Sequence, residues 1–218
     1  FELETAGVLK AGKKFWALAK TGKETALKGK DVVGGYLLLA TSCDGTLATT
    51  ATLTSIRVVC NNTLTVALNG AASAVKVPHN TVFDGQAVKK QLGVAVSHWG
   101  SFMARMKTLS ERKIRSHEAM QYFLNVLCHS DQQQNSTKSG LVNERALKRV
   151  QELYDGSGKG ADLASASGTA WGLLNAVTEY VDHERRARSQ EYRLDSAWFG
   201  QGAALKQRAL DQAMQLVA

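Results

Sequence analysis

The chain has 218 residues, of which 44% are hydrophobic and 21% are charged, a composition typical of folded globular proteins and unlike that of disordered ones. No stretch approaches the roughly 20 consecutive apolar residues of a membrane-spanning helix, so we expect no membrane partner. The 27 Lys and Arg residues outnumber the 19 Asp and Glu residues, for a net charge of +8, which favours a polyanionic partner.

The first 80 residues are predicted to form β-strands, because β-branched and aromatic residues occur in short runs between Gly- and Asn-containing turns. A lysine-rich turn at residues 10–13 predicts a β-hairpin. Asp44-Gly45 predicts a second hairpin with a type I′ turn, which requires a positive φ at both central residues. In chain order, we expect strands at 1–9, 14–20, 36–43 and 46–60, a short helix at 64–68 with Asn61 and Asn62 at its N-cap, and an edge strand at 75–79.

From Asp84 onward, the hydrophobic residues recur at helical spacing, and Asp84 is predicted to cap a helix of about 25 residues. Further helices are expected at 116–129, 141–154, 169–190 and 198–217. Strands followed by helices, without βαβ alternation, predict an α+β fold, in which an antiparallel sheet with a long β-hairpin is packed by a long helix and followed by a helical C-terminal part. We expect a basic α+β core at 1–130, a polar linker at 131–140 and a helical region at 141–218.

Three segments resemble a known family. They are Gly35–Ser42 (GYLLLATS), Thr54–Leu64 (TSIRVVCNNTL) and the stretch from Trp171 to His183, which contains NAVTEYVDH. They are similar to a phage- and plasmid-like family defined by a domain of unknown function, and the resemblance covers essentially the whole chain. It implies a mobile-element context, in which DNA replication, recombination and counter-defence dominate. The predicted layout is also similar to the core of single-strand annealing proteins of the Red-beta, RecT and Rad type, which is an analogy of fold alone.

Basic residues beside aromatic ones are the predicted DNA contacts, because cations bind phosphates and an aromatic face stacks on a base. Residues 1–115 contain 16 basic and 7 acidic residues, and the alternative is a solvated surface or an acidic protein partner. Phe15 and Trp16 alternate beside the lysine-rich turn, so one of them should be core. Arg57 lies in an apolar strand, where an unpaired guanidinium is costly, and predicts either a groove or a structural ion pair or subunit contact. The predicted DNA-binding residues are Lys10, Lys13, Lys14, Lys20, Lys23, Arg57, Lys89 and Lys90.

A possible metal site is formed by Glu179, Asp182 and His183, at positions i, i+3 and i+4 of one predicted helix. Two carboxylates and an imidazole on one face suit a divalent metal, as in some nucleases. The alternative is an exposed helix face with salt bridges, because two arginines follow Asp182 at helical spacing. Residues 156–160 (GSGKG) contain part of a phosphate-loop pattern but lack its flanking Gly and Ser or Thr, which indicates a linker.

Together these features predict a protein of a mobile element that binds single-stranded DNA without sequence preference. It would act in strand annealing during homologous recombination, without catalytic residues, metal or cofactor. Its affinity should fall steeply with salt. We expect a homo-oligomer, a ring or a filament, because one subunit covers few nucleotides. Three cysteines are too few for a disulfide scaffold and favour the reducing cytoplasm of a bacterial host. The alternatives are a metal-dependent nuclease using the acidic triplet and a counter-defence inhibitor.

Overall fold

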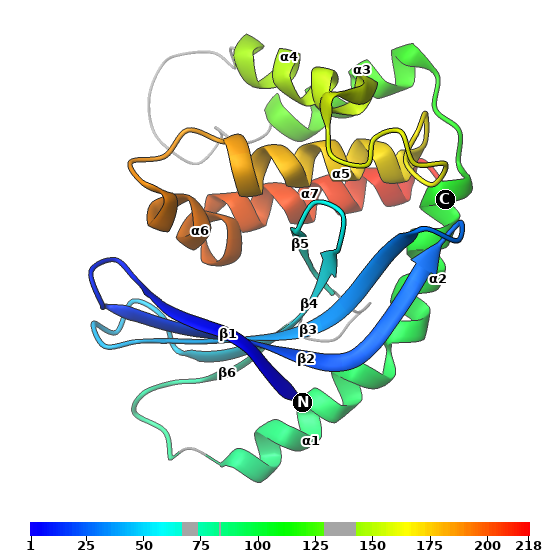
Figure 1. The fold of residues 1–218 in the computed structure, drawn as a ribbon. Coiled ribbons are helices and arrows are strands. Elements are labelled where there is room, and N and C mark those ends of the chain that lie inside the picture. The colour runs from blue at the N-terminus through cyan, green and yellow to red at the C-terminus, as the bar shows by residue number, and fades with distance from the viewer. Residues whose placement is uncertain (67–73, 83, 129–142) are drawn as a thin grey trace. The chain divides into compact units, whose positions relative to one another are not determined.

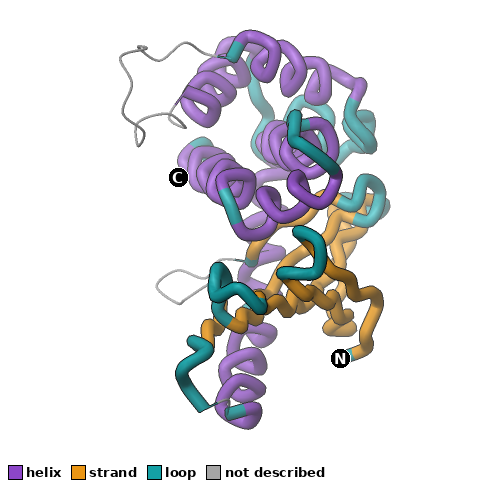
Figure 2. Tube along the Cα trace, turned by 90° about the vertical axis from the view of Figure 1, so that its left-hand side faces the viewer, coloured by secondary structure: helices purple, strands orange, loops and turns teal. Residues whose placement is uncertain are grey.

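A computed structural model describes residues 1–66, 74–82, 84–128 and 143–218 (Figure 1). The described residues form an antiparallel sheet followed mainly by helices, which confirms the predicted α+β class (Figure 2). The chain divides into two compact units. Unit 1 comprises Phe1–Ala26, Val32–Val58 and Thr63–Ala104, and unit 2 comprises Leu27–Asp31, Val59–Asn62 and Arg105–Ala218.

These units divide the chain differently from the predicted domains at 1–130 and 141–218. The division between them falls inside a helix, between Ala104 and Arg105. Two short segments of the N-terminal half, Leu27–Asp31 and Val59–Asn62, group with the C-terminal helices. The predicted linker at 131–140 lies outside the described residues.

The sheet has six strands in the order β1-β2-β3-β4-β5, and β6 pairs with β4. The β1–β2 hairpin is confirmed, with Leu9 opposite Lys14 across the turn. Because β1 pairs only with β2 in this order, it lies at an edge of the sheet. The strands are β1 (Glu2–Leu9), β2 (Lys14–Leu27), β3 (Asp31–Ser42), β4 (Thr49–Arg57), β5 (Asn62–Thr65) and β6 (Ala74–Val77).

The predicted type I′ turn at Asp44-Gly45 is wrong, although β3 and β4 do form a hairpin. Only Gly45 has a positive φ, of 74°, and six residues separate the two strands. The side chain of Asp44 accepts hydrogen bonds from the backbone N–H of Thr46, at 3.1 Å, and from its hydroxyl, at 2.6 Å. The Asp44 side chain thus stabilises a longer loop by local hydrogen bonds. The Asp-Gly pair alone does not distinguish such a loop from a two-residue turn.

The short helix predicted from residue 64 is also wrong, because residues 62–65 form strand β5. Asn62 does not cap a helix. Its side-chain amide donates to the backbone carbonyl of Asn175 at 3.3 Å, and both residues belong to unit 2. Strand pairing therefore outweighs the local capping signal. The predicted edge strand near residues 75–79 is present as β6, which ends just before Pro78, as expected for a residue that cannot donate to a ladder.

The long helix predicted from Asp84 is present as two helices that end and begin around His98. Asp84 is the expected cap, since its carboxylate accepts from the backbone N–H groups of Gln86 and Ala87 at 2.9 and 3.0 Å. The α-helices are α1 (Gly85–Ser97), α2 (Trp99–Glu111), α3 (Ser116–Cys128), α4 (Glu144–Glu152), α5 (Ala170–Glu179), α6 (Gln190–Phe199) and α7 (Gln201–Gln215). Single π-helical turns extend two of the helices: η2 (Leu153–Ser157) follows α4, and η3 (Tyr180–Glu184) follows α5.

Unit 1 is held together by the start of α2 against the sheet. The indole N–H of Trp99 donates to the hydroxyl of Thr25 at 3.1 Å, and a Cβ at Gly35 would lie 3.1 Å from the Trp99 ring. Glycine is therefore needed at this point of β3, because any larger residue would displace the ring that covers the strand.

Unit 2 is built around α5, in which every residue is buried. The indole N–H of Trp171 and the hydroxyl of Ser165 both donate to the carboxylate of Asp31, at 2.9 and 2.6 Å. Asp31, the first residue of β3, is itself only 1% exposed, so this buried acid is satisfied by the helical part of the same unit.

Candidate functional site

The eight predicted DNA-binding residues all belong to unit 1, but they differ in accessibility. Lys14 and Arg57 are only 6% and 3% exposed. Both leave almost no surface for a phosphate, so neither is included in the proposed DNA interface. Lys10 is half-buried. The exposed residues of the predicted set are Lys13, Lys20, Lys23, Lys89 and Lys90.

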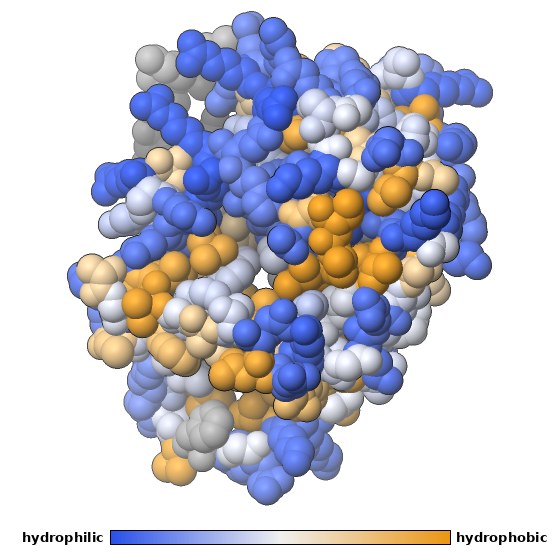
Figure 3. All heavy atoms as spheres, in the orientation of Figure 1, coloured by the Kyte–Doolittle hydropathy of each residue, from blue (hydrophilic) through white to orange (hydrophobic). Residues whose placement is uncertain are grey.

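The tip of the β1–β2 hairpin has an exposed cation and an exposed aromatic ring close together in sequence. Lys13 is the last residue of the turn, and its backbone carbonyl accepts from the N–H of Cys43 at 2.8 Å. Phe15 follows two residues later, as the second residue of β2. Phe15 is 49% exposed, and Val8, its partner across the hairpin, is 56% exposed. Figure 3 shows hydrophobic groups at the surface between hydrophilic ones.

Phe15 is exposed and Trp16 is only partly buried, so neither belongs to the core, contrary to the expectation that one of them would. Trp16 lies opposite Gly7, and a Cβ at Gly7 would lie 3.0 Å from the indole ring. The ring therefore packs over the backbone of β1. This leaves Phe15 as the aromatic side chain of the hairpin that is available for stacking.

Lys20 is exposed, but its charge is partly neutralised. Its ammonium lies 2.5 Å from a carboxylate oxygen of Glu4 on the neighbouring strand. The hydrogen bond to Glu4 and its negative charge raise the pKa of Lys20. A phosphate would have to compete with this carboxylate, so Lys20 is a weaker contact than Lys13.

The acidic triplet does not assemble into a metal site. The Glu179 carboxylate is buried and accepts from the backbone N–H of Lys159, with both oxygens at 3.1 Å. Asp182 pairs with Lys206 at 2.6 Å, and the two side chains are 7% and 5% exposed. His183 is exposed. No group of three or more His, Cys, Asp or Glu residues within the described segments is arranged to hold a metal. The alternative of an exposed, salt-bridged face is wrong as well, since both carboxylates are buried.

The glycine-rich loop at residues 156–160 serves a structural purpose. Its backbone binds the protein's own Glu179 carboxylate, as described above. A Cβ at Gly158 would lie 2.6 Å from the backbone carbonyl oxygen of Leu153 and 3.1 Å from a Glu179 oxygen, so only glycine fits. This arrangement agrees with the interpretation that the segment is no phosphate loop.

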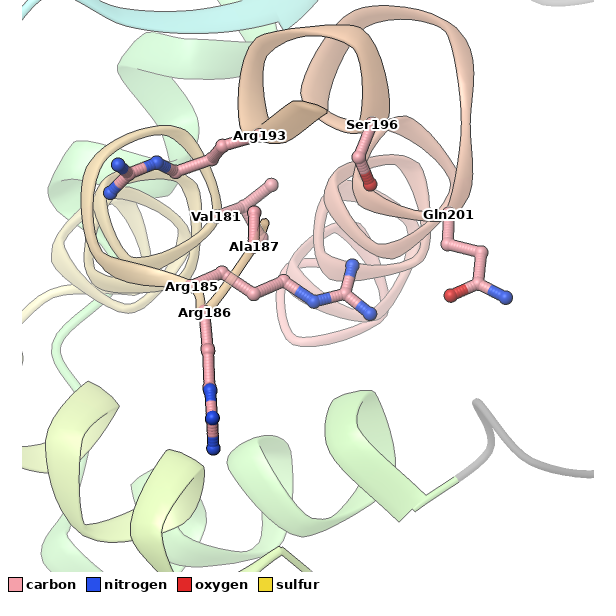
Figure 4. Close-up of a pocket in the computed structure, with 7 residues that line it drawn as sticks. All are labelled: Val181, Arg185, Arg186, Ala187, Arg193, Ser196 and Gln201. Carbon is pink, nitrogen blue, oxygen red and sulfur yellow. The ribbon is translucent and has the colours of Figure 1, made fainter. Parts of the chain in front are cut away.

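The net charge is divided equally between the two units, although the basic excess lies in the first half of the sequence, because part of that half belongs to unit 2. Unit 1 contains nine basic and five acidic residues, and unit 2 contains 18 and 14, so each has a net charge of +4. None of the predicted DNA-binding residues belongs to unit 2. Arg185, Arg186 and Arg193 line a cavity in this unit (Figure 4). In the sequence, the adjacent Arg185 and Arg186 are a signal of local positive charge, which the alternative interpretation of the acidic triplet pairs with Asp182.

Comparison with known proteins identifies a matching family but indicates no activity. Residues 1–198 match the family described as Domain of unknown function (DUF932). No curated protein and no solved structure matches the chain. Every helix of the described segments is too short or too polar to span a lipid bilayer.

Proposed function

The chain belongs to this family of unknown function, and we propose that it binds single-stranded DNA without sequence preference through the tip of its β1–β2 hairpin. The observation that supports this most is the exposed ring of Phe15, two residues after the exposed Lys13 at the tip of the hairpin. An exposed aromatic ring in water gains little by itself, whereas stacking on a base contributes about 1–3 kcal/mol. The neighbouring ammonium would bind the phosphate of the stacked nucleotide.

Unit 1 has further exposed lysines, which we propose as additional phosphate contacts. Lys23 lies in β2, ten residues after Lys13 in the sequence. Lys89 and Lys90 are exposed on α1. Contacts of this kind bind the backbone and leave the bases free, which is the property that strand annealing requires. We therefore propose annealing of complementary strands, in the mobile-element setting that the resemblance implies, as the activity of the bound complex.

The edge of the sheet supports assembly into a homo-oligomer. Strand β1 has eight residues and pairs only with β2 in the strand order. Leu3 and Val8 on this strand are 65% and 56% exposed. A long edge strand with exposed apolar side chains is a template for pairing with another chain. A second copy of this protein would extend the sheet and lengthen the DNA-binding surface.

The test is fluorescence anisotropy with a labelled single strand and the matching duplex at two salt concentrations. Phe15→Ala should weaken single-strand binding roughly tenfold, in line with the loss of one stacked base. Lys13→Glu should weaken it further at low salt and less at high salt. The matched control is Lys148→Glu, an exposed lysine on α4 in unit 2, which should leave the affinity within twofold.

Annealing is followed in parallel by energy transfer between two labelled complementary strands, whose pairing the wild-type protein should accelerate. The proposal is wrong if the wild-type protein does not bind a single strand at low salt, or if Phe15→Ala and Lys13→Glu bind as tightly as the control. Melting temperatures of all variants should agree, because both side chains are exposed.

A further inference from the structure

Unit 2 contains a small cavity of about 170 Å³ whose wall carries three arginines (Figure 4). The wall is formed by the end of η3, the segment that follows it, and the helices α6 and α7. Within the described part of the chain, its lining residues include no Asp or Glu. The side chains that matter are those of Val181, Arg185, Arg186, Arg193, Ser196 and Gln201.

Arg185 is the residue that indicates a ligand. One of its terminal guanidinium nitrogens, Nη1, is buried and has no hydrogen-bond partner among the described residues. Figure 4 shows this side chain extending toward the part of the cavity where Ser196 and Gln201 lie. A buried donor without an acceptor is costly, and more so when it is charged. The arrangement therefore calls for an acceptor that the described residues do not provide.

The carboxylates closest to Arg185 in sequence are held by other residues. Glu184 accepts from Nε and Nη2 of Arg149 at 2.5 and 2.7 Å. Asp182 forms the buried pair with Lys206. Neither acid is left to neutralise the cavity, although both are within three residues of Arg185. Of the three arginines, Arg185 extends toward Ser196 and Gln201, whereas Arg186 and Arg193 extend in other directions from the wall (Figure 4). The cavity is therefore positively charged mainly through Arg185, with the other two charges at its margin.

Neighbouring polar groups suit an oxyanion. Arg193 donates to the backbone carbonyl of His183, which fixes its guanidinium beside the cavity. The hydroxyl of Ser196 accepts from the N–H of Gly202 at 3.1 Å, so its own hydrogen remains available to donate. Helix α7 has 15 residues and begins at Gln201, in the cavity wall, where the positive end of its dipole adds to the field.

We propose that this cavity binds a phosphoryl group, either as inorganic phosphate or as the phosphate of a monoester. The planar fork of a guanidinium binds two oxygens of one phosphate, which explains why arginines would gather here. The volume exceeds the roughly 30 Å³ share of one water and falls below the roughly 300–1,000 Å³ of sites for larger ligands. A phosphoryl group fits, whereas the organic part of a monoester would extend outside. The site lies in unit 2 and is independent of the DNA-binding surface proposed for unit 1.

The test is isothermal titration calorimetry of the full chain at constant ionic strength, with three probes: inorganic phosphate, a nucleoside 5′-monophosphate and the corresponding nucleoside. The proposal expects saturable binding of phosphate, of the monophosphate or of both, and none of the nucleoside. Arg185→Gln should weaken that binding at least tenfold. The matched control is Arg188→Gln, an exposed arginine stacked 5.8 Å from the ring centre of Tyr192, which should stay within twofold.

A structural role for Arg185 is distinguished by the melting temperature without phosphate. Because Nη1 has no partner among the described residues, Arg185→Gln should not lower it. Phosphate should raise the melting temperature of the wild-type protein and of Arg188→Gln, but not that of Arg185→Gln. If Arg185→Gln fails to fold, Arg186→Gln, which removes another charge from the lining, should weaken binding more than Arg188→Gln does. Tighter binding of the monophosphate identifies a monoester ligand, and binding of phosphate alone identifies the free ion. Binding of neither, nucleoside binding, or equal affinity of Arg186→Gln and Arg188→Gln overturns the proposal.

Discussion

Replacement of Asp182 by asparagine should destabilise unit 2 strongly, because it leaves the ammonium of Lys206 buried without its carboxylate. The two side chains lie 2.6 Å apart and are 7% and 5% exposed. An exposed ion pair contributes about 0–1 kcal/mol, but removal of one partner from a buried pair costs about 3–5 kcal/mol. The burial of both groups selects the larger range. For a chain of this length, the expected fall in melting temperature is roughly 6–20 °C.

Circular dichroism at 222 nm during heating and during urea titration measures this loss. The double variant Asp182→Leu with Lys206→Met removes both charges at similar volume and should recover most of the stability, since apolar replacements of buried pairs are often neutral or better. Lys148→Met, the same replacement at an exposed position of α4, is the control and should change the free energy of unfolding by less than about 0.5 kcal/mol.

Two results would refute this reasoning. One is an unchanged melting temperature for Asp182→Asn, and the other is a double variant as unstable as the single one. The same experiment also tests the nuclease interpretation. If Asp182 were a metal ligand, its negative charge would be repelled by the other carboxylates of the site in the metal-free protein. Asp182→Asn would remove that repulsion, so it would keep or raise the stability while abolishing magnesium-dependent cleavage.

Three smaller predictions concern single side chains. Gly172→Ala should lower the melting temperature, although alanine favours helices, because its Cβ would clash with the carbonyl oxygen of Ala166; a rise in melting temperature would contradict the packing of α5. The hydrogen bonds from Thr46 lower the pKa of Asp44 from 3.8 to about 2, so their contribution to stability is present above pH 4 and lost as the pH falls toward 2. Carboxyl NMR should show this pKa returning toward 3.8 in Thr46→Val. Burial raises the pKa of Tyr154 to about 12, so stability should fall between pH 10 and 12, where the unfolded chain releases this proton and the folded chain keeps it; absorbance at 295 nm follows the titration.

Local patterns predicted the fold class and much of the fold. The alternation of apolar residues on either side of Lys10–Lys13 predicted the first hairpin, and Asp84 predicted the start of α1. These signals are short-range, because a strand face or a helix cap depends on residues a few positions apart. Where a longer-range contact competed, the local signal failed, as at Asn62, whose side chain binds Asn175 instead of capping a helix.

The composition and the residue types of the sequence alone predicted a globular α+β protein with an excess of basic residues. Tertiary structure alone decided which of its charged residues are accessible. It buried Lys14 and Arg57, turned the predicted metal ligand Asp182 into the partner of Lys206, and gathered Arg185 and Arg193 around a cavity. The physical reason is that the availability of a charge depends on burial and on its nearest opposite charge, and both are set by segments far apart in the chain.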